Sequence, residues 1–218
     1  MCGIVAASAQ HDITELLISG LQTLEYRGYD SAGIAVHADG QVRRERIQGK
    51  VSALQALLTE HPLSGFSGIA HTRWATHGVP SDRNAHPMAA GDRVALVHNG
   101  IIENHDELRA ELEAQGVTFS SETDTEVMVH LVAGLLDQGL DLFAAVRAAV
   151  KRLHGAFAIA VIAASEPGVV VGARRGSPMV LGLGEGQNYL ASDVYPLLPV
   201  TKEFVFLEEG DVVRLDTD

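Results

Sequence analysis

The chain opens with Met1-Cys2-Gly3-Ile4-Val5-Ala6-Ala7, and this segment holds its most informative residues. The apolar run that starts at Ile4 predicts a short buried strand. Cys2 is the only cysteine in the 218 residues. A small residue after an initiator methionine favours removal of Met1, so we expect a mature chain that begins with Cys2. That residue would then carry a thiol with an ordinary pKa near ~8.5 and an α-amine with a pKa near ~8, which could accept the thiol proton.

A structural role is the competing interpretation of Cys2, because a free cysteine is more often a small buried hydrophobe than a nucleophile. The position of Cys2 favours the nucleophile, since processing at Met1 would expose an amine on the same residue. Gly3 also leaves room for close approach of a second molecule. We therefore treat Cys2 as a candidate nucleophile that needs further site residues.

The composition is that of a globular α/β protein, with 46% hydrophobic and 20% charged residues. One cysteine allows no disulfide within the chain, and the apolar run 156–164 is far shorter than the about 18 residues of a membrane span. We therefore expect a cytoplasmic protein without a membrane segment. The formal net charge of −12 argues against nucleic acid or an anionic membrane as a partner, because phosphates attract clustered Lys and Arg.

Strand patterns precede and follow a group of helical patterns. Asp39-Gly40 predicts a hairpin turn, and Asp12, Asn104 and Asp124 are the expected helix N-caps. We expect helices over 12–24, 51–58, 104–115, 125–136 and 142–153, an irregular stretch over 72–93, and strands over 4–9, 31–37, 41–47, 68–71, 94–98, 157–163, 169–174, 179–183, 189–191, 204–207 and 212–215. This order predicts an α+β fold of hairpin-rich sheets covered by helices, rather than a doubly wound one. With no convincing linker, we expect one domain over 1–218.

The stretch His71-Thr72-Arg73-Trp74-Ala75-Thr76-His77-Gly78 follows an expected strand and opens the irregular segment. Loops after strands often carry sites, and an arginine there can bind a carboxylate with two hydrogen bonds. Taken alone, Arg73 could equally be a solvated surface charge. Trp74 taken alone is better explained as a core residue.

Two further polar groups follow apolar elements. Asn99-Gly100 comes directly after an expected strand, and an Asn amide beside a Gly N–H could form an oxyanion hole. Its alternative is an Asn-Gly turn. Asp124 could present a carboxylate to an ammonium group, although helix capping alone would explain it. A thiol, an oxyanion pair, an Arg and an Asp together describe a site for an α-amino acid with an attackable side-chain carbonyl, which is the shape of glutamine.

The same residues carry a family resemblance over essentially the whole chain. The blocks that carry it are Cys2-Gly3-Ile4-Val5, Leu24 to Gly33, His71 to Gly78, Asn84-Ala85-His86-Pro87, His98 to Asn104 and Ser121 to Glu126. They resemble the class II glutamine amidotransferases, which are N-terminal nucleophile hydrolases. The resemblance implies a four-layer αββα sandwich of two mostly antiparallel sheets, hydrolysis of L-glutamine, and no metal or cofactor.

The resemblance also implies roles for individual residues. Cys2 matches the nucleophile and its own amine the general base, Asn99 and the Gly100 N–H match the oxyanion hole, Arg73 matches the binder of the glutamine α-carboxylate, and Asp124 matches the binder of its α-amino group. A retained Met1 would block the amine and the mechanism with it.

Other matched positions surround the nucleophile. Arg27 and Gly28 match the segment that orients the terminal cysteine, and Trp74 matches a residue that shields the site and gates the path of ammonia. The residues that match the glutamine pocket are Thr76, His77 and His86.

The resemblance is strongest to the branch of the family that makes aminosugars, in which a sugar-phosphate isomerase domain using fructose 6-phosphate follows the glutaminase domain. We expect that isomerase part to lie outside the 218 residues. Three alternatives stay open: a phosphoribosyl acceptor, a glutamine-binding module without catalysis, and a metal site formed by Cys2, His71, His77 and His86. The last is disfavoured because no pair has the usual ligand spacing.

Overall fold

The computed structural model describes residues 2–74 and 79–217. The expected removal of Met1 and the predicted glutamine-pocket roles of Thr76 and His77 concern residues outside those ranges. The helices are α1 (Thr14–Leu24), α2 (Val51–Glu60), α3 (His105–Ala114), α4 (Asp124–Asp137) and α5 (Leu142–Val150). The strands are β1 (Gly3–Ala9), β2 (Ser31–Ala38), β3 (Gln41–Gln48), β4 (Ser67–Arg73), β5 (Met88–Ala90), β6 (Val94–Ile102), β7 (Gly155–Ala163), β8 (Val170–Arg175), β9 (Val180–Gly184), β10 (Gln187–Ala191), β11 (Glu203–Phe206) and β12 (Val212–Leu215).

These strands form two antiparallel sheets. The seven-stranded sheet has the order β11-β9-β10-β1-β4-β2-β3, and the five-stranded sheet has the order β12-β8-β7-β6-β5. The expected hairpin at Asp39-Gly40 is confirmed, since β2 and β3 pair in register from Ser31 with Gln48 to Ala38 with Gln41. Strand β1 lies inside the larger sheet between β10 and β4, so the chain start is paired on both sides.

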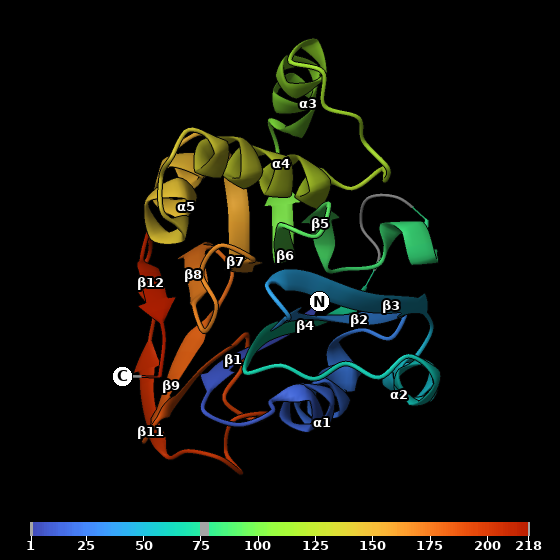
Figure 1. Ribbon diagram of the computed structural model, residues 1–218, viewed down its shortest axis with the longest axis vertical. Helices are drawn as coiled ribbons and strands as arrows, with labels where there is room; N and C mark the ends of the chain where they lie inside the picture. The colour runs from blue at the N-terminus through green and yellow to red at the C-terminus, as the bar shows by residue number, and fades with distance from the viewer. Residues whose placement is uncertain (1, 75–78, 218) are drawn as a thin grey trace.

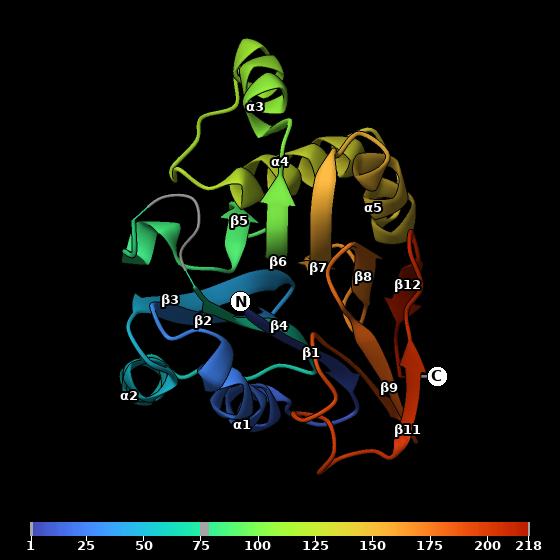
Figure 2. The ribbon, with the colours of Figure 1, turned by 180° about the vertical axis from the view of Figure 1, so that it is seen from behind.

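The two sheets stack face to face and helices cover both outer faces (Figures 1 and 2). One core cluster joins α3, α4 and α5 to the five-stranded sheet, a second joins α1 and α2 to the seven-stranded sheet, and a third lies between the sheets. The predicted α+β class and four-layer αββα arrangement are therefore confirmed.

Strand β1 shows why these strands read as continuous apolar runs. Successive side chains of a strand point to opposite faces. Ile4 and Ala6 belong to the cluster between the sheets, whereas Val5 and Ala7 belong to the cluster under the helices. Both faces are buried, so both are mainly apolar, and the buried Ser8 hydroxyl donates to the Gly168 carbonyl.

Strands β4 and β6 are longer than predicted. Strand β4 continues through Arg73, and β6 continues through Ile102, so Asn99 and Gly100 lie inside a strand. The alternative of an Asn-Gly turn is thus wrong. The reason is that β7 pairs with β6 along its whole length, from Val94 to Ile102, and this ladder supports the polar residues. The expected irregular stretch 72–93 also contains a short 3-10 helix, Asp82–Asn84, and strand β5.

The predicted helix caps need correction at all three sites. Ile13, rather than Asp12, is at the N-cap of α1, and Asp12 accepts a hydrogen bond from the Thr14 N–H at 2.9 Å from one residue further out. The Asn104 side chain makes no capping bond to α3. Thr123, rather than Asp124, caps α4 by accepting from the Glu126 N–H.

In the described ranges, no helix has both the length and the apolar character needed to cross a membrane.

Candidate active site

The space between the sheets collects the predicted site residues from three strands. Side chains separated by an even number of residues share a face of a strand. Cys2, Arg73 and Asn99 are thus on the same faces as Ile4, Ile69 and Val97, all of which belong to the cluster between the sheets. The register Gly3 opposite Thr72 also sets Cys2 beside Arg73. The sheet pairing therefore brings together residues that are far apart in sequence.

The thiol of Cys2 lies against the backbone of Trp74. The Trp74 N–H donates to Cys2 Sγ at 3.2 Å, and Sγ lies 3.5 Å from the Trp74 carbonyl oxygen. Burial raises the pKa of the Cys2 thiol, while the Trp74 hydrogen bond and the Arg73 charge oppose that rise. The thiol is therefore the main form near neutral pH, and a base must take its proton before attack.

Asn99 and Gly100 meet Cys2 from β6 of the other sheet. The Asn99 amide nitrogen donates to the Cys2 carbonyl oxygen at 3.0 Å. Gly100 has φ +132°, and a Cβ there would lie 2.0 Å from the Ala156 oxygen, so only glycine fits. An amide nitrogen and a glycine backbone without a side chain thus stand beside the thiol, as an oxyanion hole requires.

A cavity of about 230 Å³ opens at the thiol. Among the described residues, its lining side chains are Cys2, Arg27, Trp74, Asn99, Gly100, Ile101, Ser177 and Pro178. The sequence predicted five of these. The other three, Ile101 and, in the turn between β8 and β9, Ser177 and Pro178, were missed. A Gly-Ser-Pro turn after an apolar strand is the only local signal for the last two. Arg73, His86 and Asp124 do not line this cavity.

Arg73 and Asp124, the two charged residues of the predicted site, are both buried. Arg73 is 4% exposed and Asp124 is 5% exposed, so the interpretation of Arg73 as a surface charge is wrong. Burial lowers the pKa of Arg73, and the charges of Cys2, Asp124 and Asp30 oppose that shift. One Asp124 oxygen accepts from the Ile102 N–H at 2.9 Å. Arg73 thus sets a buried positive charge beside Cys2, and Asp124 sets a buried negative charge at the end of β6, where charge interactions are stronger than in water.

Trp74 is 45% exposed, so the interpretation as a core residue is wrong as well. Its ring makes an edge-to-face contact with Tyr29, with ring centroids 5.9 Å apart. Trp74 therefore forms the outer wall of the cavity.

Arg27 and Gly28 support the Cys2 segment from outside. Arg27 donates to Asp193 Oδ2 at 2.8 Å and to the Ser192 carbonyl at 3.2 Å, while Ser192 Oγ accepts from the Ile4 N–H. A Cβ on Gly28 would lie 2.8 Å from the Trp74 nitrogen that bonds the thiol. These contacts agree with a segment that orients Cys2. Asp193 has no sequence signal, because its role depends on a contact across 166 residues.

His86 lies behind the cavity and is 5% exposed. Its Nδ1 is 3.3 Å from Nε2 of His71, and the two ring centroids are 4.3 Å apart. Burial lowers the pKa of His86 well below its ordinary range. His86 is therefore neutral and contacts the site through His71.

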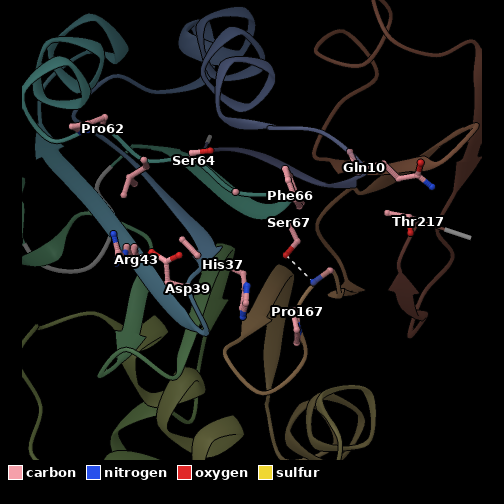
Figure 3. A pocket seen from close by; sticks show the side chains of 15 residues that line it. Gln10, His37, Asp39, Arg43, Pro62, Ser64, Phe66, Ser67, Pro167 and Thr217 are labelled. Atoms are coloured by element: carbon pink, nitrogen blue, oxygen red, sulfur yellow. Dashed lines mark hydrogen bonds and ion pairs between the residues drawn. The ribbon is translucent and has the colours of Figure 1, made fainter.

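A larger cavity of about 790 Å³ lies elsewhere, at the β2–β3 turn and the loop before β4 (Figure 3). In the described part of the chain its lining includes His37, Asp39, Arg43 and Phe66, and none of the predicted site residues. Size alone does not identify a site; the smaller cavity has the nucleophile and the oxyanion donors. No group of three or more His, Cys, Asp or Glu side chains among the described residues could hold a metal ion.

The fold and this site define the class. The N-terminal nucleophile amidotransferases have this arrangement: two antiparallel sheets lie between helix layers, and a cysteine comes directly before a central strand. A family model described as "Glutamine amidotransferase domain" matches residues 71–199, and the chain belongs to that family.

Individual relatives are named more specifically. The chain is 56% identical over 219 residues to glutamine–fructose-6-phosphate aminotransferase (isomerizing) of Pseudomonas putida, covering 100% of this chain and 36% of the relative. It is 55% identical over 216 residues to the protein of that name from Escherichia coli K12, covering 99% of this chain and 35% of the relative. The chain thus spans about a third of the length of these curated relatives.

Solved structures support the fold alone. A glutamine phosphoribosylpyrophosphate amidotransferase from Bacillus subtilis matches with a TM-score of 0.83 at 23% identity, over 99% of this chain and 47% of that one. A structure titled as the allosteric regulatory enzyme of purine biosynthesis matches with a TM-score of 0.84 at 24% identity, over 99% and 47%.

Proposed function

We propose that this chain hydrolyses L-glutamine to L-glutamate and ammonia through a γ-glutamyl thioester on Cys2. The observation that carries the proposal is the meeting of the Cys2 thiol with the Asn99 amide and Gly100 at one cavity, with buried Arg73 beside Cys2 across the β1–β4 pairing and buried Asp124 bonded to the end of β6. A nucleophile, oxyanion donors and paired opposite charges are what an amide-bearing amino acid needs.

In the proposed reaction, the α-amine of a mature N-terminal Cys2 takes the thiol proton and the thiolate attacks the δ-carbonyl carbon. The carbonyl electrons move to oxygen, and Asn99 Nδ2 and the Gly100 N–H stabilise that oxyanion. Asn99 Nδ2 has two hydrogens, so one can stay on the Cys2 carbonyl while the other donates to the oxyanion. The C–N bond then breaks, and the ammonium of Cys2 gives its proton to the leaving ammonia.

The thioester is then hydrolysed. Water adds to the thioester carbonyl while the Cys2 amine accepts a proton, and the C–S bond breaks to release glutamate and the thiol.

The two charged groups on the α-carbon of glutamine, the carboxylate and the ammonium, need separate binding partners. We assign the α-carboxylate to the Arg73 guanidinium, which can bind it with two hydrogen bonds, and the α-ammonium to Asp124. Arg27 and Gly28 would orient the nucleophile, and Trp74 would cover the cavity. Roles in the glutamine pocket for Thr76, His77 and His86 are carried by the resemblance.

The fate of the ammonia is a wider proposal. The relatives at 55–56% identity are named for a fructose 6-phosphate reaction, which favours glucosamine 6-phosphate synthesis by a longer protein with a sugar-phosphate isomerase domain. Phosphoribosyl transfer is less favoured, because the structure from that class shares only 23% identity. The same proposal includes a cytoplasmic location, which the single cysteine supports.

The direct test combines intact mass with product analysis on one sample. We expect a mass without Met1 and equal amounts of glutamate and ammonia from glutamine. The control is asparagine, which is one methylene shorter and should place its carbonyl out of reach of the thiol. Full-speed hydrolysis by a chain that retains Met1 would contradict the mechanism. Stoichiometric binding of glutamine without products would instead favour a binding module.

Replacing Arg73 with alanine should weaken glutamine binding more than it slows turnover. Charge-assisted hydrogen bonds contribute about 1.5–3 kcal/mol, so we expect KM to rise about 10- to 100-fold. Arg73→Lys should recover part of the lost glutamine binding, since lysine keeps the positive charge but cannot form the two parallel hydrogen bonds of a guanidinium. The matched control is Arg43→Ala, an exposed arginine paired with Asp39 outside the site, which should leave KM unchanged. An unchanged KM in Arg73→Ala would refute the carboxylate role.

A further inference from the structure

The side chain of His71 touches the proposed oxyanion donor from behind. His71 is on β4, is fully buried, and faces the space between the sheets. Its Nε2 lies 3.0 Å from the His98 carbonyl oxygen and 3.0 Å from Asn99 Oδ1. The resemblance to the family assigned no role to His71, and it does not line the cavity at Cys2.

The His98 carbonyl decides the tautomer of His71. A backbone carbonyl can only accept a hydrogen bond, so Nε2 of His71 must bear the hydrogen. The other close neighbour, Nδ1 of His86 at 3.3 Å, is then also an acceptor. Burial lowers the pKa of His71 to about 3, so the ring is neutral at working pH and keeps this tautomer.

The tautomer in turn decides the orientation of the Asn99 amide. An Nε2–H can face only the amide oxygen, because the amide NH₂ group is a donor. The NH₂ group is therefore turned to the other side, where it donates to the Cys2 carbonyl at 3.0 Å. A rotation of the amide by half a turn would put an oxygen where negative charge develops.

We propose that His71 is a positioning residue for hydrolysis: its Nε2–H holds Asn99 Oδ1, and this keeps the Asn99 NH₂ group directed at the oxyanion. The inference rests on the proposed function. Without the Nε2–H, we expect the inverted orientation of the amide to predominate, so that the donor is present for only a small fraction of the time. We expect a turnover loss of roughly 10- to 100-fold, below the roughly 10²- to 10³-fold loss that follows removal of the donor itself.

The test is a double-mutant cycle on the 218-residue chain with His71→Leu and Asn99→Ala. Alone, His71→Leu should lower kcat by that factor with KM changed by less than about twofold. In the Asn99→Ala background it should cause no further loss, because no donor is left to position. Equal losses in both backgrounds would show a general structural role and overturn the inference.

Two conservative variants guard against a folding defect. A Gln amide can place an N–H at the position of Nε2, whereas an Asn amide reaches only the position of Nδ1. His71→Gln should thus recover most of kcat and His71→Asn should not. Equal activity of the two would contradict the inference. His37→Leu is the matched control: His37 Nε2 also contacts a backbone carbonyl, at 3.2 Å from Ala164, but lies outside the site. It should keep wild-type kcat.

The unmodified chain and Cys2→Ala are assayed alongside these variants. The unmodified chain could hydrolyse glutamine while the kcat losses of His71→Leu and Asn99→Ala multiply in the double variant. In that case the role of His71 is wrong and the proposed function stands. If the unmodified chain with a free Cys2 amine does not hydrolyse glutamine, the proposed function fails and the inference fails with it.

Discussion

Replacing Cys2 with alanine is expected to abolish glutamine hydrolysis and leave the fold and glutamine binding intact. Removal of a nucleophile costs ~10⁶-fold in turnover, since no other group forms the thioester. The thiol's contacts are with the Trp74 backbone, so alanine should leave unfolding temperature nearly unchanged. Product release and calorimetric binding of glutamine, measured on the same sample, check the two parts.

Cys2→Ser is the matched variant, because it keeps a small polar side chain at the same position. A hydroxyl is far less acidic than a thiol, so turnover should remain very low. A glutamine-like electrophile should label the unmodified chain once and should label neither variant. Substantial hydrolysis by Cys2→Ala would end the proposal that Cys2 is the nucleophile.

Replacing Asn99 with alanine is the second large effect. Loss of one oxyanion donor costs about 10²- to 10³-fold in kcat, or about 3–4 kcal/mol, because the charge that develops on oxygen is left unpaired. KM should change little, since the bond forms mainly in the transition state. Steady-state kinetics of glutamate release measure both quantities.

Asn104→Ala separates this effect from a loss of stability. The Asn104 amide also bonds to backbone groups, the Arg152 carbonyl and the His154 N–H, but at the start of α3. Its removal should lower the unfolding temperature and leave kcat unchanged. Near-normal turnover in Asn99→Ala would remove this residue from the mechanism.

Asn99 also shows where sequence analysis is weakest. The change from apolar Val97 to polar residues predicted the end of a strand, yet β6 runs on to Ile102. A polar side chain between two sheets is stable only if its hydrogen bonds are met, and here His71 and Cys2 meet them. Those partners belong to other strands, so local pattern could not reveal them.

Asp124 illustrates a different error. Thr123 and Asp124 are both good capping residues in sequence, and periodicity does not decide between neighbours. The structure uses Thr123 as the cap, which leaves the Asp124 carboxylate to accept from the Ile102 N–H and to lie 3.9 Å from Nδ1 of His98. The capping interpretation was therefore wrong, while the role of Asp124 toward a substrate ammonium stays a prediction.

Local sequence pattern was enough to predict most strands and helices and the residue types available for chemistry, because periodicity, turns and side-chain reactivity are local properties. The resemblance of the whole chain to the class II glutamine amidotransferases also predicted the four-layer αββα sandwich. Only the tertiary structure decided that Cys2 meets an amide 97 residues away, that Arg73 is buried while Trp74 is exposed, and that His71 holds Asn99. The physical reason is that strand register and the stacking of two sheets set these contacts, and both depend on pairing between distant segments.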